Sequence, residues 1–494
     1  MQITSNSGDI TAQAVDALIL YKIQDADLQT IADIVDKALD GAIRTVIDAG
    51  DFTGKSNETL ILYTNNAISA KRVIVVGLGN AEDVSTEAIR QASATGTQKA
   101  QSLNLKTLAT YPTISNTTTV QDASQSITEG TMLGLYHYHG QKTEDAPHEL
   151  DELLIVSEEE STVSQGIEIG RAFAEGTILA RDLINLPPNI ATPAYLAQQA
   201  QEMAQSVGLK CTIFDRPQMQ ALKMGAILGV AQGSDAPPKF IILEHNADKH
   251  QEGNTVVLVG KGVTFDTGGY SLKSRDGMIG MKADMSGGAA VIGAMKTIAK
   301  LNLPIHVAGL IPASDNMIGS KAYRPQEVLT ASNGKTIEII STDAEGRLLL
   351  ADALVYAQRF NPVAVVDIAT LTGSIMVALG HAMTGVYSNS DDVVAKLNTS
   401  ADATSENIWR MPMSPEYGNS LKSDTADTKN SGGRAGGAGV AAHFLSNFVD
   451  YNWAHIDMAG MLNNEGLIPY QPKHSARGYG TRLLAEFARQ WGSE

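Results

Sequence analysis

The feature that most constrains the fold of this chain is an alternation of strand-like and helix-like segments between residues 190 and 460. Six short apolar runs have the length and composition of strands, and longer stretches with helical spacing of apolar residues separate them. Such alternation is typical of a mainly parallel sheet with helices on both faces. The strand candidates are residues 239–244, 256–259, 306–311, 336–340, 363–368 and 454–458.

The first 160 residues predict a smaller α/β domain. Strand candidates at 17–21, 59–63, 72–76 and 153–156 lie among helical patterns at 30–40 and 88–103, and the polar stretch 111–130 is expected to be a surface loop. A long helical pattern then runs from 162 to 185 into NLPPN, where two prolines end it. We therefore expect an N-terminal domain over residues 1–160, a linker helix and turn over 161–190, and a larger domain over 191–494.

Composition and charge exclude several kinds of function. The chain has 494 residues, with 43% hydrophobic and 18% charged residues, which is ordinary for a globular protein. Its formal net charge of −17 disfavours electrostatic binding to DNA or to an anionic membrane. Cys211 is the only cysteine, so neither an internal disulfide nor a multi-cysteine zinc site can form.

One uncharged run, residues 368–390, is long enough to be considered as a membrane span. It contains three glycines and His381, so we expect a strand end, a loop and a buried helix instead. The N-terminal sequence MQITSNSGDI has no basic region followed by an apolar core, so no secretory signal is expected. These observations favour a cytoplasmic location without a membrane partner.

The sequence STDAEGRL, residues 341–348, places Asp343 and Glu345 two residues apart, with Arg347 two residues further on. A strand candidate precedes it and a helical pattern follows, so the acids are expected on a tight loop at the carboxyl end of a strand, where open α/β sheets build their sites. Two converging carboxylates repel unless a proton or a cation lies between them. The alternative is local: Asp343 would cap the helix and Glu345 would stabilise its first turn.

A second charged loop follows the strand candidate 256–259. It carries Lys261, Asp266 and Lys273, and Asp284 comes just before a helix expected to begin near Ser286. The alternatives are that Asp284 is an N-cap and that the lysines are solvated loop residues.

Together the two loops are expected to bring four carboxylates toward one edge of one sheet. Without a cation the repulsion within such a cluster would be strongly destabilising, and two divalent metal ions would neutralise it. Lys273 and Arg347 would add positive charge beside the metal ions. The ten histidines form no HExxH motif and no cluster with ligand spacing. The sequence therefore predicts a metal site of oxygen ligands, built on Asp266, Asp284, Asp343 and Glu345, with one lysine nitrogen as a further candidate ligand.

At these residues the chain resembles the leucyl aminopeptidase family, the cytosolic di-metal aminopeptidases. STDAEGRL is similar to the family signature NTDAEGRL, with Ser341 in place of the usual Asn. GKGVTFDTGGYSLK and MKADMSGGAAV, residues 260–273 and 281–291, resemble its metal-binding loop. The segments ARDLINLPPNIATPAYLA, AYRPQEVLTASNGKTIEI and WAHIDMAG are also similar, so the resemblance covers about residues 165–490.

The resemblance implies two divalent metal ions per subunit, zinc or manganese. Lys261, Asp266, Asp284 and Glu345 would hold the tighter ion, and Asp266, Asp343 and Glu345 the more exchangeable one. Lys273 and Arg347 match the two catalytic residues that are not ligands. Lys273 would stabilise the oxyanion, and Arg347 would hold a bicarbonate that shuttles a proton.

The resemblance also implies a pocket for the substrate's first side chain, an architecture and an assembly. The N-terminal domain would be of macro-like α/β type and the larger catalytic domain of α/β/α type, with a central mixed, mainly parallel sheet. Peptides would be the substrates, and six subunits would form a dimer of trimers. An additional DNA-binding or regulatory role is the alternative function, which the acidic composition does not support. The pocket positions are Met281, Thr370, Leu371, Gly373, Ala459 and Leu462.

Overall fold

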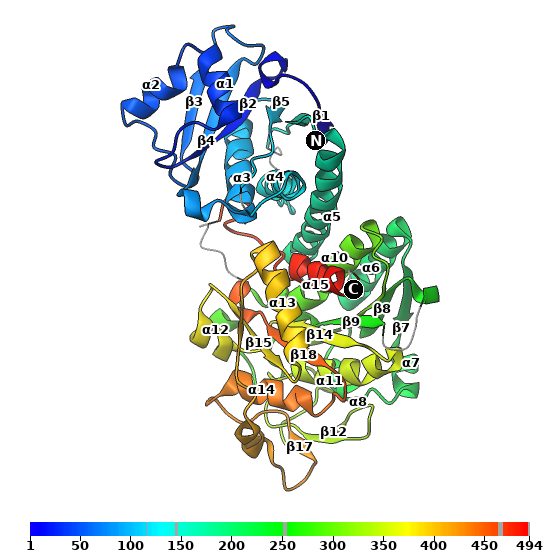
Figure 1. The fold of residues 1–494 in the computed structure, drawn as a ribbon. Helices are drawn as coiled ribbons and strands as arrows, with labels where there is room; N and C mark the ends of the chain where they lie inside the picture. Colours follow the sequence, from blue (N-terminus) through cyan, green and yellow to red (C-terminus); the bar gives the residue numbers. More distant parts are fainter. Residues whose placement is uncertain (116, 144–146, 250–253, 463–467, 493–494) are drawn as a thin grey trace. The chain divides into compact units, whose positions relative to one another are not determined.

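The computed structural model describes residues 1–494 except 116, 144–146, 250–253, 463–467 and 493–494. The chain forms two compact units, each with its own sheet (Figure 1). Unit 1 comprises Met1–Ala174 and Glu465–Lys473, and unit 2 comprises Glu175–Asn464 and His474–Glu494. The first boundary falls inside one long helix, α5 (Glu160–Asn185).

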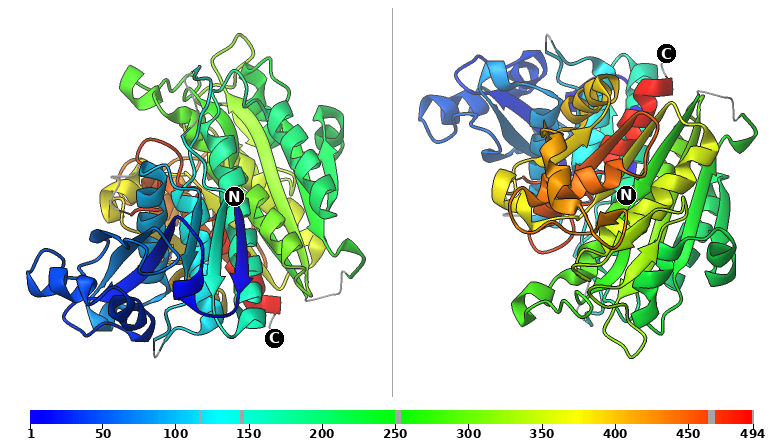
Figure 2. Two further views of the ribbon diagram at one scale, coloured as in Figure 1. Left: turned by 90° about the horizontal axis from the view of Figure 1, so that it is seen from above. Right: turned by 90° about the horizontal axis from the view of Figure 1, so that it is seen from below.

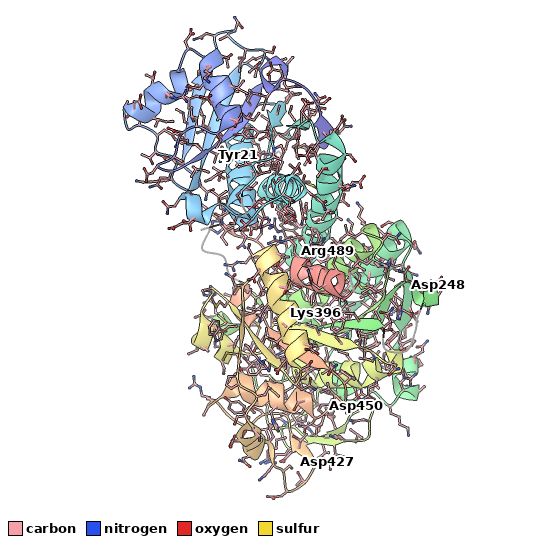
Figure 3. All side chains as sticks on the ribbon, viewed as in Figure 1. Tyr21, Asp248, Lys396, Asp427, Asp450 and Arg489 are labelled. Carbon is pink, nitrogen blue, oxygen red and sulfur yellow. The ribbon has the colours of Figure 1, made fainter. Side chains whose placement is uncertain are left out.

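Unit 1 is built on a six-stranded sheet with the order β1-β6-β5-β2-β4-β3. All neighbouring strands are parallel except β3 and β4. The ring of Tyr21, labelled in Figure 3, is completely buried in this core, and its hydroxyl pairs with that of Ser93 at 2.9 Å. The elements are β1 (Gln2–Asn6), β2 (Ala17–Ile23), α1 (Thr30–Ala38), α2 (Ala42–Asp48), β3 (Thr59–Tyr63), β4 (Arg72–Gly79), α3 (Thr86–Ser102), β5 (Thr107–Thr110), α4 (Val120–Gly134) and β6 (Glu152–Val156).

Helix α4 corrects one sequence expectation, because residues 111–130 were expected to be a surface loop. Thr119 begins the helix with a capping box to Asp122, and Ala123 and Ile127 lie in the core. The hydroxyls of Ser124 and Thr128 donate to backbone carbonyls four residues earlier, at 2.7 and 2.8 Å. Their polarity is therefore satisfied inside the helix, and composition alone was misleading.

Unit 2 is built on a larger mixed sheet with the order β16-β15-β18-β14-β9-β11-β8-β7, and β10 also pairs with β11. Its central strands β9, β14 and β18 are buried along their whole lengths, as expected of strands covered on both faces. The strands are β7 (Lys210–Phe214), β8 (Lys239–His245), β9 (Thr255–Gly260), β10 (Gly262–Asp266), β11 (His306–Asn316), β14 (Ala364–Ala369), β15 (Thr384–Ser388), β16 (Ile408–Arg410) and β18 (Trp453–Asp457).

Helices pack on the two faces of this sheet (Figure 2). Helices α6 and α10 pack against its strands and α15 packs on α10, whereas α8 and α11 pack against β11 and α14 packs on α11. The expected α/β class with a mixed, mainly parallel central sheet is thus confirmed. The helices are α6 (Pro193–Val207), α7 (Arg216–Ala221), α8 (Gly225–Val230), α9 (Arg275–Met278), α10 (Ser286–Lys300), α11 (Gly346–Ala357), α12 (Gly373–Leu379), α13 (Asp391–Thr404), α14 (Gly437–Ser446) and α15 (Thr481–Gly492).

The expected strand at 336–340 does not belong to this sheet. It is the short strand β13 (Thr336–Glu338), which pairs with β12 (Val328–Thr330) and β17 (Thr428–Lys429) in a separate three-stranded sheet. The side chains of Ile337 and Ile339 are buried in the core that also contains residues of α8 and α11. The alternating pattern therefore reflects one buried face of a small sheet, and the expectation of one common sheet was wrong.

The run 368–390 also differs from its expectation. It contains the end of β14, helix α12 and strand β15. Helix α12 is not a buried helix, because Ile375 is its only buried residue and Val377 is 90% exposed. Among the described residues, no helix is both long and apolar enough to cross a membrane.

Candidate active site

Lys261 and Asp266 lie at the carboxyl end of the large sheet. Lys261 joins β9 to β10 and is 3% exposed, and Asp266 is the last residue of β10. One oxygen of Asp266 accepts hydrogen bonds from the Gly268 N–H at 2.8 Å and from the Asn316 amide at 2.7 Å. Gly268 has a φ of +85°, and a Cβ there would lie 2.7 Å from Asp343 Oδ1. A glycine is therefore needed for the two acids to approach each other.

Asp284 lies on a short 3-10 helix (Met281–Met285) that precedes α10. It does not cap α10, whose N-cap residue is Met285, so the local alternative is wrong. Asp284 Oδ1 accepts from Lys261 Nζ and from the Thr370 hydroxyl, each at 2.7 Å. Asp284 Oδ2 is buried and has no hydrogen-bond partner.

Asp343 and Glu345 lie on the loop between β13 and α11. Neither side chain caps α11: its N-cap position is Glu345, which makes no side-chain capping bond. The loop is fixed to the Asp266 loop through Thr342, whose hydroxyl donates to the Gly268 carbonyl at 2.6 Å and accepts from the Ser271 N–H at 2.7 Å. Two different sheets thus supply the acids, and these bonds hold their loops together.

Two lysines lie between the four carboxylates. Lys261 Nζ is 2.7 Å from Asp284 and 2.9 Å from Glu345, and Lys273 Nζ is 2.8 Å from Asp266 and 2.6 Å from Asp343. One carboxylate oxygen from each of Asp266, Asp343 and Glu345 lies within 4.8 Å of the others. The close approach of like charges is therefore offset by two ammonium groups.

Burial and the neighbouring charges shift the pKa values of the four acids. Burial raises the pKa of Asp266 to about 6 and that of Asp284 to about 8, and it raises the pKa of Asp343 as well. For Glu345 burial acts in the same direction, but Lys261 and Lys273 outweigh it and hold its pKa below the ordinary value. Additional positive charge would therefore favour full deprotonation of the cluster, above all at Asp284.

The same carboxylates hold the two lysines in the charged form. Burial would lower the pKa of Lys261, but Asp284 and Glu345 outweigh it and raise that pKa above its usual range. Asp266 and Glu345 likewise raise the pKa of Lys273.

The arrangement fits divalent metal ions. Buried carboxylate oxygens without partners, on Asp284 and Glu345, are what such an ion would satisfy. The donors are oxygens and one amine, a set suited to hard or borderline divalent cations. Lys261 could act as a ligand only after losing its proton, and a bound cation would favour that loss.

Arg347 lies in the first turn of α11 and is 7% exposed. Its Nη1 donates to the Asn430 carbonyl at 2.8 Å, while its Nε is buried without a hydrogen-bond partner. Burial lowers the pKa of Arg347 to about 10, against the attraction of Glu345 and Asp457. The guanidinium remains a cation at neutral pH and has a donor that an anion could use.

All thirteen residues that the sequence singled out line one cavity of about 430 Å³. They come from five segments, at or after the ends of β9, β10, β13, β14 and β18. They are Lys261, Asp266, Lys273, Met281, Asp284, Asp343, Glu345, Arg347, Thr370, Leu371, Gly373, Ala459 and Leu462.

Sequence reasoning missed other residues of this cavity. Part of its wall comes from the segment before and at the start of α14, where five glycines lie between residues 432 and 439. That glycine density marks a segment that approaches other groups closely, and it was the available signal. No pattern pointed to Asn316, Thr342 or Asn430, which hold the loops in place. The additional lining residues are Ser341, Ala344, Thr372, Ser374, Met376, Ser431, Gly432, Gly433, Gly437 and Val440.

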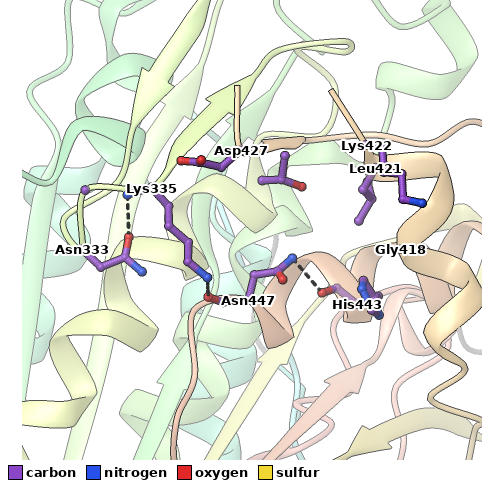
Figure 4. A pocket seen from close by; sticks show the side chains of 10 residues that line it. Asn333, Lys335, Gly418, Leu421, Lys422, Asp427, His443 and Asn447 are labelled. Atoms are coloured by element: carbon purple, nitrogen blue, oxygen red, sulfur yellow. Dashed lines mark hydrogen bonds between the residues drawn. The ribbon is translucent and has the colours of Figure 1, made fainter. Parts of the chain in front are cut away.

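A second cavity of unit 2, of about 450 Å³, lies beside the three-stranded sheet (Figure 4). Asp427 is the only acid among its ten lining residues, and the Thr336 N–H donates to its carboxylate at 2.8 Å. Lys335 Nζ donates to the Asn447 carbonyl at 2.7 Å. Asp427 and Lys335 thus already have hydrogen-bond partners, and the described residues that line this cavity include no set of convergent acids that could bind a metal ion.

The model of the cytosol aminopeptidase family catalytic domain matches residues 178–485, and the model of that family's N-terminal domain matches residues 17–145. The chain belongs to the cytosol aminopeptidase family. It is 40% identical to a probable cytosol aminopeptidase of Roseiflexus castenholzii over 99% of both chains. The identity to the probable cytosol aminopeptidase of Geobacter sulfurreducens is also 40%, again over 99% of both chains.

Solved structures support the same membership in the cytosol aminopeptidase family. A mutant of tomato leucine aminopeptidase superimposes with a TM-score of 0.88, at 32% identity, over 99% of this chain and 96% of that chain. The bottromycin maturation enzyme BotP in complex with Mn superimposes with a TM-score of 0.86, at 30% identity, over 97% of this chain and 100% of that chain. Family membership and the acidic cluster together identify a metal-dependent aminopeptidase.

Proposed function

We propose that this aminopeptidase removes leucine and other apolar residues from the N-terminus of peptides and amino-acid amides. The observation that carries the proposal is the composition of the 430 Å³ cavity, which has apolar residues beside its charged cluster: Met281, Leu371, Ala459 and Leu462. Burying an apolar side chain there is favourable by about 0.8 kcal/mol per CH₂ group. A charged first side chain would lose its hydration without gaining a partner.

The proposed metal ligands are the clustered acids and Lys261. Lys261, Asp266, Asp284 and Glu345 would hold one divalent ion, and Asp266, Asp343 and Glu345 the other. When bound, the ions would polarise the scissile carbonyl and supply a nucleophilic water at neutral pH. Their identity, zinc or manganese, is part of the proposal, and the oxygen-rich donor set supports both.

The proposed role of Lys273 is to stabilise the negative charge that develops on the carbonyl oxygen. Its raised pKa keeps it protonated at neutral pH, and at 18% side-chain exposure it still reaches the cavity. A fixed cation at this position would stabilise the transition state by about 3–4 kcal/mol.

The proposed role of Arg347 is to hold a bicarbonate that carries a proton. Its buried, unpartnered Nε supports this role, because that N–H can donate to an anion. In buffer free of carbon dioxide the rate should fall, and added bicarbonate should restore it. An Arg347→Ala variant should be slow under both conditions, and equal stimulation of that variant would remove the role.

The experiment that tests the proposed function is a comparison of first residues. Protein stripped of metal and reloaded with Zn²⁺, Mn²⁺ or Co²⁺ is given the amides of leucine, methionine, alanine, glutamate and lysine, and N-acetyl-leucinamide. We expect the amides of leucine and methionine to be cleaved fastest. The acetylated amide should not be cleaved, because in this proposal the free amino group of the substrate binds at the acidic cluster. Equal rates for all side chains, or cleavage of the acetylated amide, would contradict the proposal.

We also propose that six copies form a dimer of trimers in the cytoplasm. Exposed apolar side chains on and near the Lys273 loop support an interface: Tyr270, Leu272, Ile279 and Ile318 are each between 47% and 70% exposed. Light scattering should give the mass of six chains. A monomeric mass at micromolar concentration would contradict this assembly.

A further inference from the structure

Two neighbouring strand ends supply most of the apolar pocket. Thr370, Leu371 and Gly373 follow β14, and Ala459 and Leu462 follow β18. The strands are parallel, with Ala369 of β14 opposite Asp457 of β18. The distance between these two loops therefore determines the width of the pocket for the first side chain.

A single buried carboxylate joins the two loops. Asp457 is 1% exposed and does not line the cavity itself. Its Oδ1 accepts from the backbone N–H groups of Leu371 at 3.1 Å, Thr372 at 3.3 Å and Ala459 at 3.4 Å. Its Oδ2 accepts from the Thr372 hydroxyl at 2.6 Å.

The same carboxylate orients the start of α12. The Thr372 hydroxyl donates to Asp457 and accepts from the Ile375 N–H at 3.2 Å, so it caps the helix while it is held by the acid. The first residue of that helix is Gly373, which lines the pocket. Loss of the Asp457 bonds would therefore release both the loop after β14 and the first turn of α12.

A buried histidine behind Asp457 favours the ionised form of its carboxylate. His455, two residues earlier on the same face of β18, pairs with Asp367 of β14 at 2.6 Å, and Asp367 also accepts from the Trp453 indole at 2.7 Å. Burial lowers the pKa of His455, but Asp367 outweighs it and raises that pKa. Burial raises the pKa of Asp457, and the protonated form of His455 lowers it and so offsets part of that effect.

We propose that Asp457 is the positioning residue of the specificity pocket, because it fixes the loops after β14 and β18 at the spacing that accepts a leucine-sized side chain. This inference rests on the proposed function, in which that pocket receives the first side chain of the substrate. Asp457 acts through the backbone of Leu371, Thr372 and Ala459 and does not touch the substrate. Asp457 therefore affects the selectivity for the first residue of the substrate more than it affects the rate of the chemical step.

The test compares Asp457→Ala and Asp457→Asn with wild type, all reloaded with the same metal, using leucinamide and alaninamide. Asp457→Ala should raise KM for leucinamide by about tenfold or more and reduce the leucine-to-alanine ratio of kcat/KM by a similar factor. Metal content should stay at the wild-type level, and kcat should change less than KM. Asp457→Asn should recover most of the ratio, since its amide oxygen can accept the same three N–H groups and its NH₂ can donate to Thr372.

A matched control separates pocket positioning from general loss of stability. Asp352 is another buried carboxylate of unit 2 that accepts backbone N–H groups, from Ala226, Ile227 and Ser332 at 2.7–3.0 Å. Asp352→Ala should lower the unfolding midpoint and leave the leucine-to-alanine ratio unchanged. If Asp457→Ala does not fold, Thr372→Val decides the matter, because it removes the 2.6 Å bond and should lower the ratio in the same direction.

An unchanged leucine-to-alanine ratio in Asp457→Ala, or in Thr372→Val where the former does not fold, would overturn the inference. So would a loss of kcat that is equal for both substrates with KM unchanged. If wild-type protein itself does not distinguish leucinamide from alaninamide, the proposed function has failed instead.

Discussion

Lys261 Nζ lies 2.9 Å from Glu345 Oε1, and both side chains are almost completely buried, at 3% and 2% exposure. The pair is possible because the residue after Glu345 is glycine: a Cβ on Gly346 would lie 2.5 Å from Lys261 Cε. The glycine of the DAEGR segment therefore provides the space through which the lysine reaches the acids. This relationship connects the sequence motif directly to the charge balance of the site.

The first prediction concerns that charge balance. In metal-free protein, prepared with a chelator, Lys261→Ala should destabilise unit 2 by about 3–5 kcal/mol, because the buried Asp284 and Glu345 lose their shared ammonium partner. The measurement is urea unfolding in the presence of the chelator. Arg410→Ala is the control, since its pair with Asp391 lies exposed in unit 2 and should contribute at most about 1 kcal/mol. Equal effects of the two substitutions would contradict the buried ion pair.

The second prediction separates metal ligands from catalytic groups. Lys273→Ala should retain both metal ions and lose about 10²–10³-fold in kcat, because an oxyanion-stabilising cation is removed. Elemental analysis of the purified variant, combined with the rate per bound metal, is the measurement. A variant that lost metal but kept its rate per metal would show that Lys273 is not the oxyanion partner.

The third prediction concerns the shape of the pocket. A Cβ added to Gly373 has no atom within 4 Å, so side chains at this position would extend into the open cavity without disturbing the fold. Gly373→Ala should reduce kcat/KM for leucinamide relative to alaninamide, and Gly373→Leu should reduce it by about 10–200-fold. Steady-state kinetics on the two amides gives the ratio. A ratio that does not depend on residue size at 373 would place the first side chain elsewhere.

The fourth prediction concerns pH and stability. Burial raises the pKa of Asp352 to about 6, despite the three backbone N–H groups that it accepts. Its unfolded pKa is near 3.9, so the folded protein binds more protons between roughly pH 4 and pH 6. The stability contributed by this group is therefore present below roughly pH 4 and is lost as pH rises through 6, by roughly 3 kcal/mol in total.

This dependence can be isolated with Asp352→Asn, which cannot titrate. The free energy of unfolding of wild type minus that of the variant should fall as the pH is raised from 4.5 to 7.5, a range that spans the folded pKa of about 6. Parallel pH profiles for the two proteins would show that Asp352 does not titrate in this range.

The sequence predicted the long buried strands well, and it placed the candidate site residues near strand ends, for identifiable reasons. Strand β9 is an apolar run that ends at Gly260 before Lys261, and β14 is apolar except for the buried Asp367, so their pattern reflects burial on both faces. The acids could be identified from the sequence because converging carboxylates repel one another unless cations lie between them. The thirteen positions reached one cavity because they lie on loops at strand ends.

Features set by long-range contacts could not be predicted in this way. Strand β13 shows the same alternation as a strand of the large sheet, and only its pairing with β17, some ninety residues away, places it in another sheet. Helix α4 is hidden by its serines and threonines, whose hydroxyls are satisfied by the helix itself. Asp457 lies in the segment WAHIDMAG, but nothing in that segment indicates its role, which emerges only when the loops that it joins are seen together.

The central claim is that the acidic cluster binds two catalytic metal ions, and a metal titration tests it most directly. Protein stripped of metal is titrated with Mn²⁺ or Zn²⁺ while bound metal and leucinamide hydrolysis are measured on the same samples. We expect no hydrolysis before metal is added, saturation at two ions per chain, and reduced occupancy of both sites in Glu345→Gln. Full activity in protein that elemental analysis shows to be metal-free would contradict the account.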